Sequence, residues 1–208
     1  IAKESTAVFL DEPLANLDQR GQRQPEGAVA DLFAGRGAVV VYATSEPAEA
    51  LMLGGKAALM NDGRVTQFGP TAEIYRRPNT LTSARVFSDP PINSAVIVKE
   101  GTTARLAAGA SWTLKGPAAG LRDGSYTVAI RPNYVSPRTE GADRVALSGQ
   151  VLVTELSGSE SSAHFRMGQD TWVSLASGVH PYSIGSDYKF YMDPAHCFYF
   201  APDGALVA

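Results

Sequence analysis

The sequence predicts an α/β unit with a mostly parallel sheet, followed by an all-β domain. Two apolar runs, residues 8–10 and 38–44, have the composition of strands that are buried on both faces of a parallel sheet. Helix signals almost vanish after two adjacent prolines near residue 90, where short β-branched and aromatic runs recur between turn residues. We therefore expect two domains, residues 1–88 and residues 89–208.

The first predicted strand ends in two adjacent carboxylates. Asp11 and Glu12 follow the apolar run and precede Pro13, which suits the start of a helix or turn. Ligands of open α/β sheets bind outside the carboxyl ends of the strands, so a carboxylate there can hold a hydrated Mg²⁺ against nucleotide phosphates. The alternative is an ordinary strand end, because Asp-Glu-Pro after an apolar strand is common in α/β proteins.

The rest of the first domain continues as strand, helix and hairpin. The second apolar run predicts a strand, and Pro47 suits the first turn of the helix that follows. Residues 57–60 and 65–68 predict two strands joined by a tight turn at residues 61–64, Asn-Asp-Gly-Arg. Thr71 is expected to cap a short helix after this hairpin.

Short strands dominate the second half of the chain, and their spacing favours a small barrel. They are predicted at residues 95–98, 104–106, 126–130, 145–156, 162–165, 171–175, 188–192 and 197–200. Aromatic residues in these strands indicate barrel core rather than a surface that stacks on a ligand. Arg131 is expected to pair with a carboxylate or with the backbone, and the alternative is that it binds an anion or a ligand carboxylate. Glu155 and the loop at residues 157–162 form either a plain hairpin loop or the lining of a regulatory pocket or subunit contact.

Charge and cysteine content exclude several classes of protein. The chain of 208 residues has a net charge of −3 and 19% charged residues, which argues against nucleic acid and anionic membranes as partners. Its apolar runs fall short of the roughly 20 residues that a membrane-spanning helix needs, so we expect no direct membrane insertion. The single cysteine, Cys197, cannot form an intrachain disulfide, and no secretory leader is recognised, which favours a cytoplasmic location.

Residues 7–18, Ala-Val-Phe-Leu-Asp-Glu-Pro-Leu-Ala-Asn-Leu-Asp, resemble the Walker B motif and D-loop of an ABC transporter ATPase. The resemblance implies that the first domain is the carboxyl-terminal part of a P-loop ATPase core that works with ATP and Mg²⁺. It also implies that Asp11 orients the metal through water and that Glu12 polarises the attacking water. Asp18 would belong to the loop that touches a second ATPase subunit.

The chain departs from this family's pattern at the switch position. That residue is normally the His of a Thr-His-Asp triplet, whereas this chain has Ser45 in Thr-Ser-Glu. A hydroxyl is shorter than an imidazole and carries no positive charge, so Ser45 needs a bridging water to reach the same oxygen. The surrounding sequence, Tyr-Ala-Thr-Ser-Glu-Pro, resembles that of a branch of carbohydrate and polyol importers.

The second domain resembles the OB-like carboxyl-terminal domain, called TOBE, of sugar-importer ATPases, on residues 128–132, 149–160 and 200–204. No G-x-x-x-x-G-K-[ST] motif occurs in the chain, so this polypeptide does not supply the phosphate cradle. The run at residues 147–150, Leu-Ser-Gly-Gln, only superficially resembles the ABC signature, because it leads into a β-rich segment. We expect the chain to be the carboxyl-terminal portion of a longer subunit and to be inactive as an ATPase by itself.

The resemblance implies the ATP-hydrolysing, energy-coupling subunit of an ABC importer for a carbohydrate or polyol such as glycerol or glycerol phosphate. Its partners would be a second, identical or different, ATPase subunit and membrane permease subunits, at the cytoplasmic face of the inner membrane. Two alternatives stay open. The chain is a stand-alone regulatory or ligand-binding β-module, or it belongs to a catalytically degenerate ATPase subunit beside an active partner.

Overall fold

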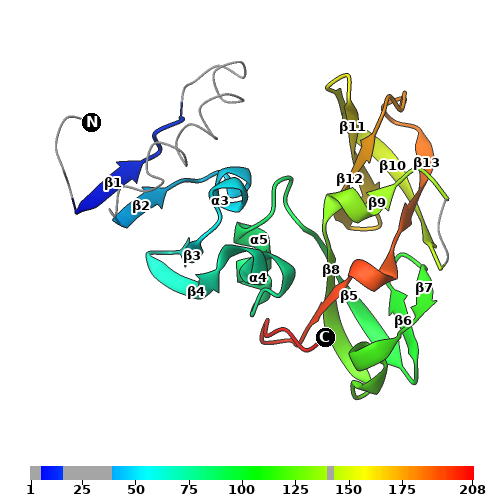
Figure 1. The fold of residues 1–208 in the computed structure, drawn as a ribbon. Coiled ribbons are helices and arrows are strands. Elements are labelled where there is room, and N and C mark those ends of the chain that lie inside the picture. The colour runs from blue at the N-terminus through cyan, green and yellow to red at the C-terminus, as the bar shows by residue number, and fades with distance from the viewer. Residues whose placement is uncertain (1–5, 16–38, 140–142) are drawn as a thin grey trace. The chain divides into compact units, whose positions relative to one another are not determined.

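The computed structural model of the chain describes residues 6–15, 39–139 and 143–208 (Figure 1). These residues are mostly β, and their helices are short. The chain divides into two compact units, Ile1–Arg77 and Pro78–Ala208. The domain limits expected from the proline segment, at residues 88 and 89, stay a prediction.

In the first unit, the two apolar runs form neighbouring parallel strands, as expected. β1 (Ala7–Asp11) pairs with β2 (Val39–Ala43) in a regular register that sets Asp11 opposite Ala43 (Figure 1). Because the strands are parallel and in register, their carboxyl ends lie at one edge of the sheet.

The expectation that these strands are buried on both faces is wrong for the described residues. Phe9 is 77% exposed and Val39 is 64% exposed. The described sheet has only these two strands, so each has a hydrogen-bonded neighbour on one side alone. The expected mostly parallel α/β sheet is found here as this single pair, and no P-loop core is evident in the described residues.

After β2 the chain forms α3 (Pro47–Leu53) and then an antiparallel hairpin of β3 (Lys56–Asn61) and β4 (Arg64–Pro70). The predicted tight turn is confirmed. Asp62 and Gly63 both have positive φ, at 48° and 72°, the conformation that makes Asp-Gly a favoured hairpin turn.

The next helix, α4 (Thr71–Arg76), corrects the capping prediction. Pro70 occupies the N-cap position and Thr71 is the first helical residue. Pro70 offers no side-chain acceptor, and the Thr71 hydroxyl instead donates to the carbonyl oxygens of Gly54 and Gly55, at 3.0 and 3.3 Å. Thr71 therefore satisfies carbonyl groups just beyond α3 rather than N–H groups of its own helix.

The second unit begins with the short helix α5 (Leu81–Val86). Thr80 caps this helix, because its hydroxyl accepts a hydrogen bond from the backbone N–H of Ser83 at 3.1 Å. The N–H of Leu81 donates to the carbonyl of Gly204 at 2.9 Å, which ties α5 to the last residues of the chain.

Two five-stranded antiparallel sheets make up most of this unit, and all eight predicted strands form. The sheet with the order β14-β8-β5-β6-β7 consists of β5 (Asn93–Glu100), β6 (Thr103–Leu106), β7 (Ser111–Thr113), β8 (Gly124–Ile130) and β14 (Phe198–Phe200). The sheet with the order β12-β11-β10-β13-β9 consists of β9 (Val135–Ser136), β10 (Val145–Leu156), β11 (Glu160–Met167), β12 (Asp170–Ser177) and β13 (Asp187–Met192). Single-turn helices lie between strands: η1 (Gly116–Gly120), η2 (Pro132–Tyr134) and η3 (Pro194–His196).

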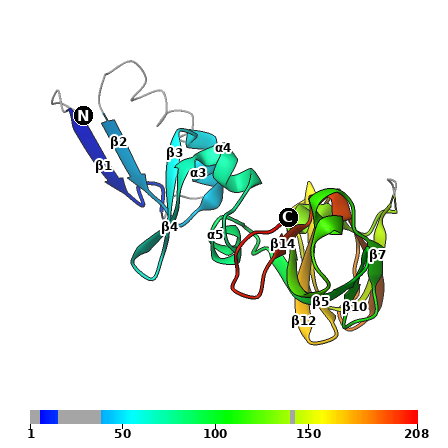
Figure 2. The same cartoon turned by 90° about the horizontal axis from the view of Figure 1, so that it is seen from below.

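The sheet that contains β9 and β12 curls into a nearly closed barrel. These two strands are its edges, yet they lie beside each other. The Ser174 hydroxyl of β12 donates to the carbonyl of Val135 in β9 at 2.8 Å, and Ser174 is fully buried. Figure 2 shows the strands of this unit around one interior. The structure therefore confirms the expected barrel as a nearly closed one.

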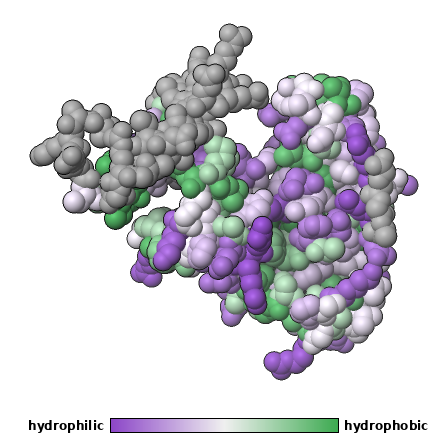
Figure 3. Space-filling view, viewed as in Figure 1, coloured by the Kyte–Doolittle hydropathy of each residue, from purple (hydrophilic) through white to green (hydrophobic). Residues whose placement is uncertain are grey.

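One apolar core joins both sheets. Its largest fully buried side chains include Trp172, Phe165, Phe190, Ile97, Ile130 and Leu147. The rings of Phe165 and Phe190 stack at a centroid distance of 4.0 Å. On the face in Figure 3, polar side chains and small apolar patches are interspersed. The buried aromatic residues therefore serve as core, as the sequence indicated.

Gly149 in β10 gives the Leu-Ser-Gly-Gln run a structural role. A Cβ atom at this position would lie 2.5 Å from Cδ2 of Phe165 and 2.7 Å from the carbonyl oxygen of Arg166. Only glycine allows β10 and β11 to approach this closely. The run therefore belongs to a strand whose packing requires the glycine.

Asn93, the first residue of β5, joins the two sheets with its side-chain amide. Its Nδ2 donates to the carbonyl of Val173 in β12 at 2.8 Å, and its Oδ1 accepts from the N–H of Val173 at 2.6 Å. Asn93 is buried, so the amide stands where a partner strand would otherwise satisfy this edge of β12.

We predict that Asn93→Ala destabilises the second unit by about 2–4 kcal/mol, because two buried backbone groups of Val173 lose their partners. Both tryptophans, Trp112 and Trp172, lie in the core of this unit, so urea unfolding followed by tryptophan fluorescence reports its stability. Asn133→Ala is the control, since Asn133 is exposed. Equal unfolding midpoints for the two variants would contradict the joining role of Asn93.

Candidate functional site

The parallel pairing of β1 and β2 gathers the candidate site residues of the first unit at one edge. Asp11 is the last residue of β1 and lies opposite Ala43, the last residue of β2. Glu12 follows the first strand, and Thr44 and Ser45 follow the second. Three of the residues predicted from the sequence, Asp11, Glu12 and Ser45, therefore come from two adjacent strand ends. Asp18 lies outside the described residues.

The backbone turns sharply at Glu12. Its N–H donates to the carbonyl of Ala43 at 2.9 Å, which extends the ladder one residue past β1. Its φ of 43° is in the left-handed region, which is uncommon for a residue other than glycine. The carbonyl of Glu12 then accepts from the N–H of Ala15 at 3.1 Å, and Leu14 is buried in this turn. The turn fixes the direction of the chain directly after the two carboxylates.

The carboxylates of Asp11 and Glu12 have no hydrogen bond or ion pair with the described part of the chain. Asp11 is exposed and Glu12 is half-buried. Within residues 6–15, 39–139 and 143–208, no three His, Cys, Asp or Glu side chains gather into a metal-binding group. Mg²⁺ bound with a nucleotide keeps several waters and needs only one or two protein carboxylates, so this pair fits such an ion.

A buried carboxylate on α3 holds the turn that carries Ser45. The Oε2 atom of Glu49 accepts hydrogen bonds from the hydroxyls of Thr44, at 2.7 Å, and of Tyr42, at 3.0 Å. The Thr44 hydroxyl also accepts from the N–H of Glu46 at 3.0 Å. Glu49 is only 7% exposed, and it sits in the first turn of α3, where a negative charge is favourable.

No motif in the sequence predicted this network of hydrogen bonds around Glu49. A signal existed in the spacing, because a hydroxyl at position 44 and a carboxylate at position 49 flank a proline that starts a helix. Ser45 itself is exposed at the tip of the turn. The network therefore positions Ser45 from both sides without using its side chain.

Two titratable residues of the second unit, Arg131 and Cys197, lie among groups that stabilise the fold. Arg131 is buried, and its guanidinium donates to the carbonyl of Phe87 at 2.8 Å and lies over the ring of Phe198 at 5.8 Å. The expected backbone pairing of Arg131 is confirmed. Burial, with a smaller contribution from the Asp193 carboxylate, raises the pKa of the Cys197 thiol to about 12. Cys197 is therefore a poor nucleophile near neutral pH.

Among the described residues, no helix has both the length and the apolar character that crossing a bilayer requires.

Comparison with known proteins relates the chain to import proteins. The family model described as "TOBE domain" matches residues 128–200. Over 212 residues the chain is 28% identical to the "sn-glycerol-3-phosphate import ATP-binding protein UgpC" of Yersinia enterocolitica, covering 99% of this chain and 58% of that protein.

A protein of the same name from Chromohalobacter salexigens is 30% identical over 210 residues, which cover 100% of this chain and 56% of that protein. The "Xylose/arabinose import ATP-binding protein XacK" of Haloferax volcanii is 29% identical over 172 residues, which cover 80% of this chain and 44% of that protein. The chain thus spans about half the length of these relatives.

We predict that Glu49→Ala loosens the turn at Ser45, because the hydroxyls of Tyr42 and Thr44 lose a shared acceptor. Amide hydrogen exchange at Glu46, whose N–H donates to Thr44, should become at least about tenfold faster, as expected for one lost hydrogen bond. Glu73→Ala, an exposed carboxylate on α4, is the matched control. Unchanged amide exchange at Glu46 in the Glu49 variant would contradict the role of Glu49 in positioning this turn.

We predict that iodoacetamide alkylates Cys197 at pH of about 8.5 at least about 100-fold more slowly in the folded chain than in urea. The raised pKa keeps the thiol neutral in the folded state, while unfolding restores its ordinary pKa and with it the reactive thiolate. The associated stability is present below the ordinary thiol pKa and is lost as pH rises through about 12. Equal rates in both states would contradict the burial of this thiol.

Proposed function

We propose, from the premise that this chain is the carboxyl-terminal region of an ABC importer ATP-binding subunit with a TOBE domain, that it forms part of an ATP-hydrolysing motor. In this proposal the complete subunit works at the cytoplasmic face of the inner membrane. It pairs with a second ATPase subunit, identical or different, and with membrane permease subunits.

The observation that carries this proposal is the placement, at a shared strand edge, of two carboxylates that form no hydrogen bond or ion pair within the described residues. Asp11 ends β1, Glu12 follows in a fixed turn, and both lie beside the end of β2. Ligands of α/β sheets bind outside such edges, and phosphoryl transfer depends mainly on positioning and electrostatics there. A bound Mg²⁺ would neutralise charge on the nucleotide phosphates.

Each residue then has a separate task. Asp11 would hold waters of a bound Mg²⁺ by accepting their hydrogen bonds. Glu12 accepts a proton from the water that attacks the terminal phosphate, and its constrained backbone limits the directions its carboxylate can take. Ser45 offers a hydroxyl from the neighbouring turn, which Glu49 and Thr44 hold in place. Asp18 contributes to the contact with the second ATPase subunit.

The proposed cargo is a carbohydrate or polyol, such as glycerol or glycerol phosphate. The support is the naming of the relatives, which include sn-glycerol-3-phosphate and xylose/arabinose import proteins. Because these relatives import different compounds, the choice among them needs uptake measurements on the assembled transporter.

A second candidate function rests on Ser45. A serine at the switch position lacks the charge and reach of histidine, which favours a subunit that binds nucleotide but contributes little hydrolysis. The competing expectation is that a water bridges Ser45 to the phosphate and that turnover is retained.

A third candidate function is that of a free-standing regulatory β-module. It is supported by the separate core of the second unit.

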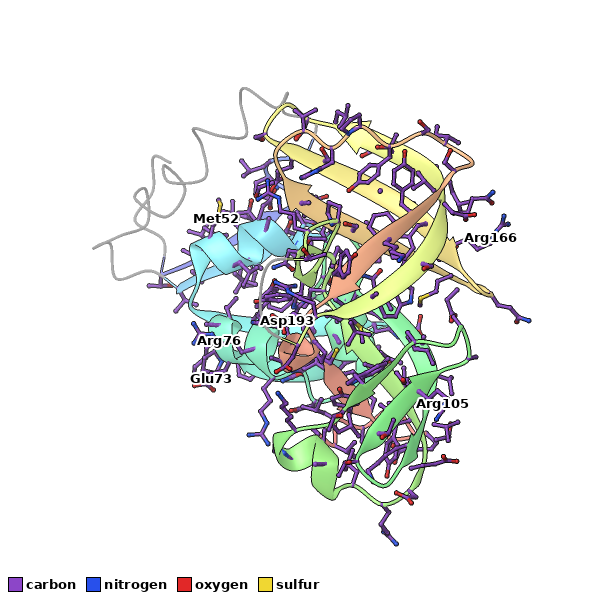
Figure 4. The ribbon with its side chains drawn as sticks, turned by 90° about the vertical axis from the view of Figure 1, so that its right-hand side faces the viewer. Met52, Glu73, Arg76, Arg105, Arg166 and Asp193 are labelled. Carbon is purple, nitrogen blue, oxygen red and sulfur yellow. The ribbon has the colours of Figure 1, made fainter. Side chains whose placement is uncertain are left out.

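The deciding experiment is ATP hydrolysis by the complete subunit, assembled with its permease partners in proteoliposomes. Glu12→Gln should lower turnover at least about 100-fold while leaving ATP binding intact, because it removes the proton acceptor but keeps the side-chain shape. Glu73→Gln, whose side chain projects from α4 (Figure 4), should leave turnover unchanged.

Unchanged turnover in the Glu12 variant would favour the degenerate subunit, with catalysis supplied by its partner. A complete protein that neither binds ATP nor assembles with a permease would overturn the proposal in favour of the regulatory module.

A further inference from the structure

The nearly closed barrel of the second unit has a seam where its edge strands, β9 and β12, meet without a hydrogen-bonded ladder. Two buried side chains close one stretch of this seam. Ser174 donates to the carbonyl of Val135, and Asn93 bonds both backbone groups of Val173. The rest of the seam, toward the carboxyl end of β12, has no such closure among the described residues.

A pocket of about 370 Å³ occupies this open stretch. Its lining includes Asn133, Ser136, Arg138, Glu160, Leu175 and Ser177. The volume is at the lower end of the range for small-ligand sites. The site therefore suits a ligand somewhat larger than a single amino acid.

One wall of the pocket is the free edge of β12. The N–H of Val173 donates to Asn93 and so points away from β11. β11 and β12 pair without a register shift, and backbone groups two residues apart along a strand point the same way. The N–H and C=O of Leu175 therefore also point away from β11, into the seam. The carbonyl of Ser177, two residues further, faces the same side by the same alternation, and it contacts Nε2 of His180 at 3.1 Å.

Asn93 shows which chemical group satisfies this edge. Its side-chain amide gives one donor and one acceptor to the backbone of Val173, as a residue of a neighbouring strand would. Leu175 presents the same donor and acceptor pair one step further along. A ligand residue whose N–H and C=O come from the two amides on either side of one Cα would complete the edge as a residue of a neighbouring strand does.

Two exposed charged side chains of opposite sign, Arg138 and Glu160, line the pocket. Arg138 forms no ion pair within the described residues, and its Nη2 atom lies 3.8 Å from the position of a Cβ atom built on Gly178. Glu160, at the start of β11, likewise forms no ion pair there. A guanidinium in this setting recognises a carboxylate through paired N–H donors. A ligand with one carboxylate can reach Arg138, whereas Glu160 disfavours further negative charge.

We propose that this pocket binds an N-acylated dipeptide, a ligand that combines two successive secondary amides with a terminal carboxylate. The C=O and N–H of the ligand's first aminoacyl residue, which belong to two different amides, pair with the N–H and C=O of Leu175, and the carboxylate pairs with the guanidinium of Arg138. Free N-acylated dipeptides carry this chemistry, and so does the carboxyl-terminal end of a polypeptide. The proposal does not depend on ATP hydrolysis, because the pocket lies within the second unit.

The test is a titration of the whole ¹⁵N-labelled chain with N-acetyl-alanyl-alanine, up to about 10 mM, followed by NMR. The amide signals of Leu175, Ser177 and Ser136 should shift together with one dissociation constant. The methyl ester of the same probe, which keeps the amides but lacks the carboxylate, should bind at least about tenfold more weakly. A longer peptide with a free carboxyl terminus and the same last two residues tests the polypeptide source: equal binding assigns the ligand to a polypeptide end, whereas much weaker binding assigns it to the free compound.

Matched variants complete the test. Arg138→Gln should weaken binding at least about tenfold, whereas Arg122→Gln, at an exposed site in the same unit, should bind as the unchanged chain does. Glu160→Gln should bind the probe at least as tightly as the unchanged chain. The proposal is overturned by an absence of shifts at Leu175, by equal binding of acid and ester, or by binding that ignores Arg138→Gln.

Discussion

The parallel register of β1 and β2 is the constraint on which the candidate active site depends. It sets Asp11 opposite Ala43, so the residues that follow the two strands share one edge. A slip by one residue would turn the side chains to the opposite face. The bond from the Glu12 N–H to Ala43, and the hold of Glu49 on Thr44, carry the same register into the turns beyond the strands. The site is therefore fixed more by backbone pairing than by contacts of its own carboxylates.

The second unit relies on side chains that replace missing strand pairing. Asn93 satisfies an edge of β12 and Ser174 links that edge to β9, so a barrel with a seam keeps its buried backbone groups bonded. In this arrangement the N–H and C=O of Leu175 have no backbone partner among the described residues in the open part of the seam. The seam between β9 and β12 thus leaves room for a ligand. The candidate sites of the two units therefore suit ligands of different chemistry.

The sequence predicted what rests on local pattern. The β-branched runs, the Asp62-Gly63 turn and the eight strands after residue 90 follow from periodicity and turn chemistry. It did not predict what rests on distant partners. The bond of Thr71 to the end of α3 depends on a contact 17 residues away, and that of Asn93 to Val173 on one 80 residues away. The exposure of Phe9 escaped it too, because an apolar run does not say how many strands flank it.

The most direct measurement is the structure of the complete subunit with Mg²⁺ and a non-hydrolysable ATP analogue. We expect Asp11 to face the metal from the carboxyl end of β1 and to accept hydrogen bonds from its water ligands. We expect Glu12 to face the terminal phosphate. A metal and nucleotide bound elsewhere, with Asp11 and Glu12 facing away from them, would contradict the account.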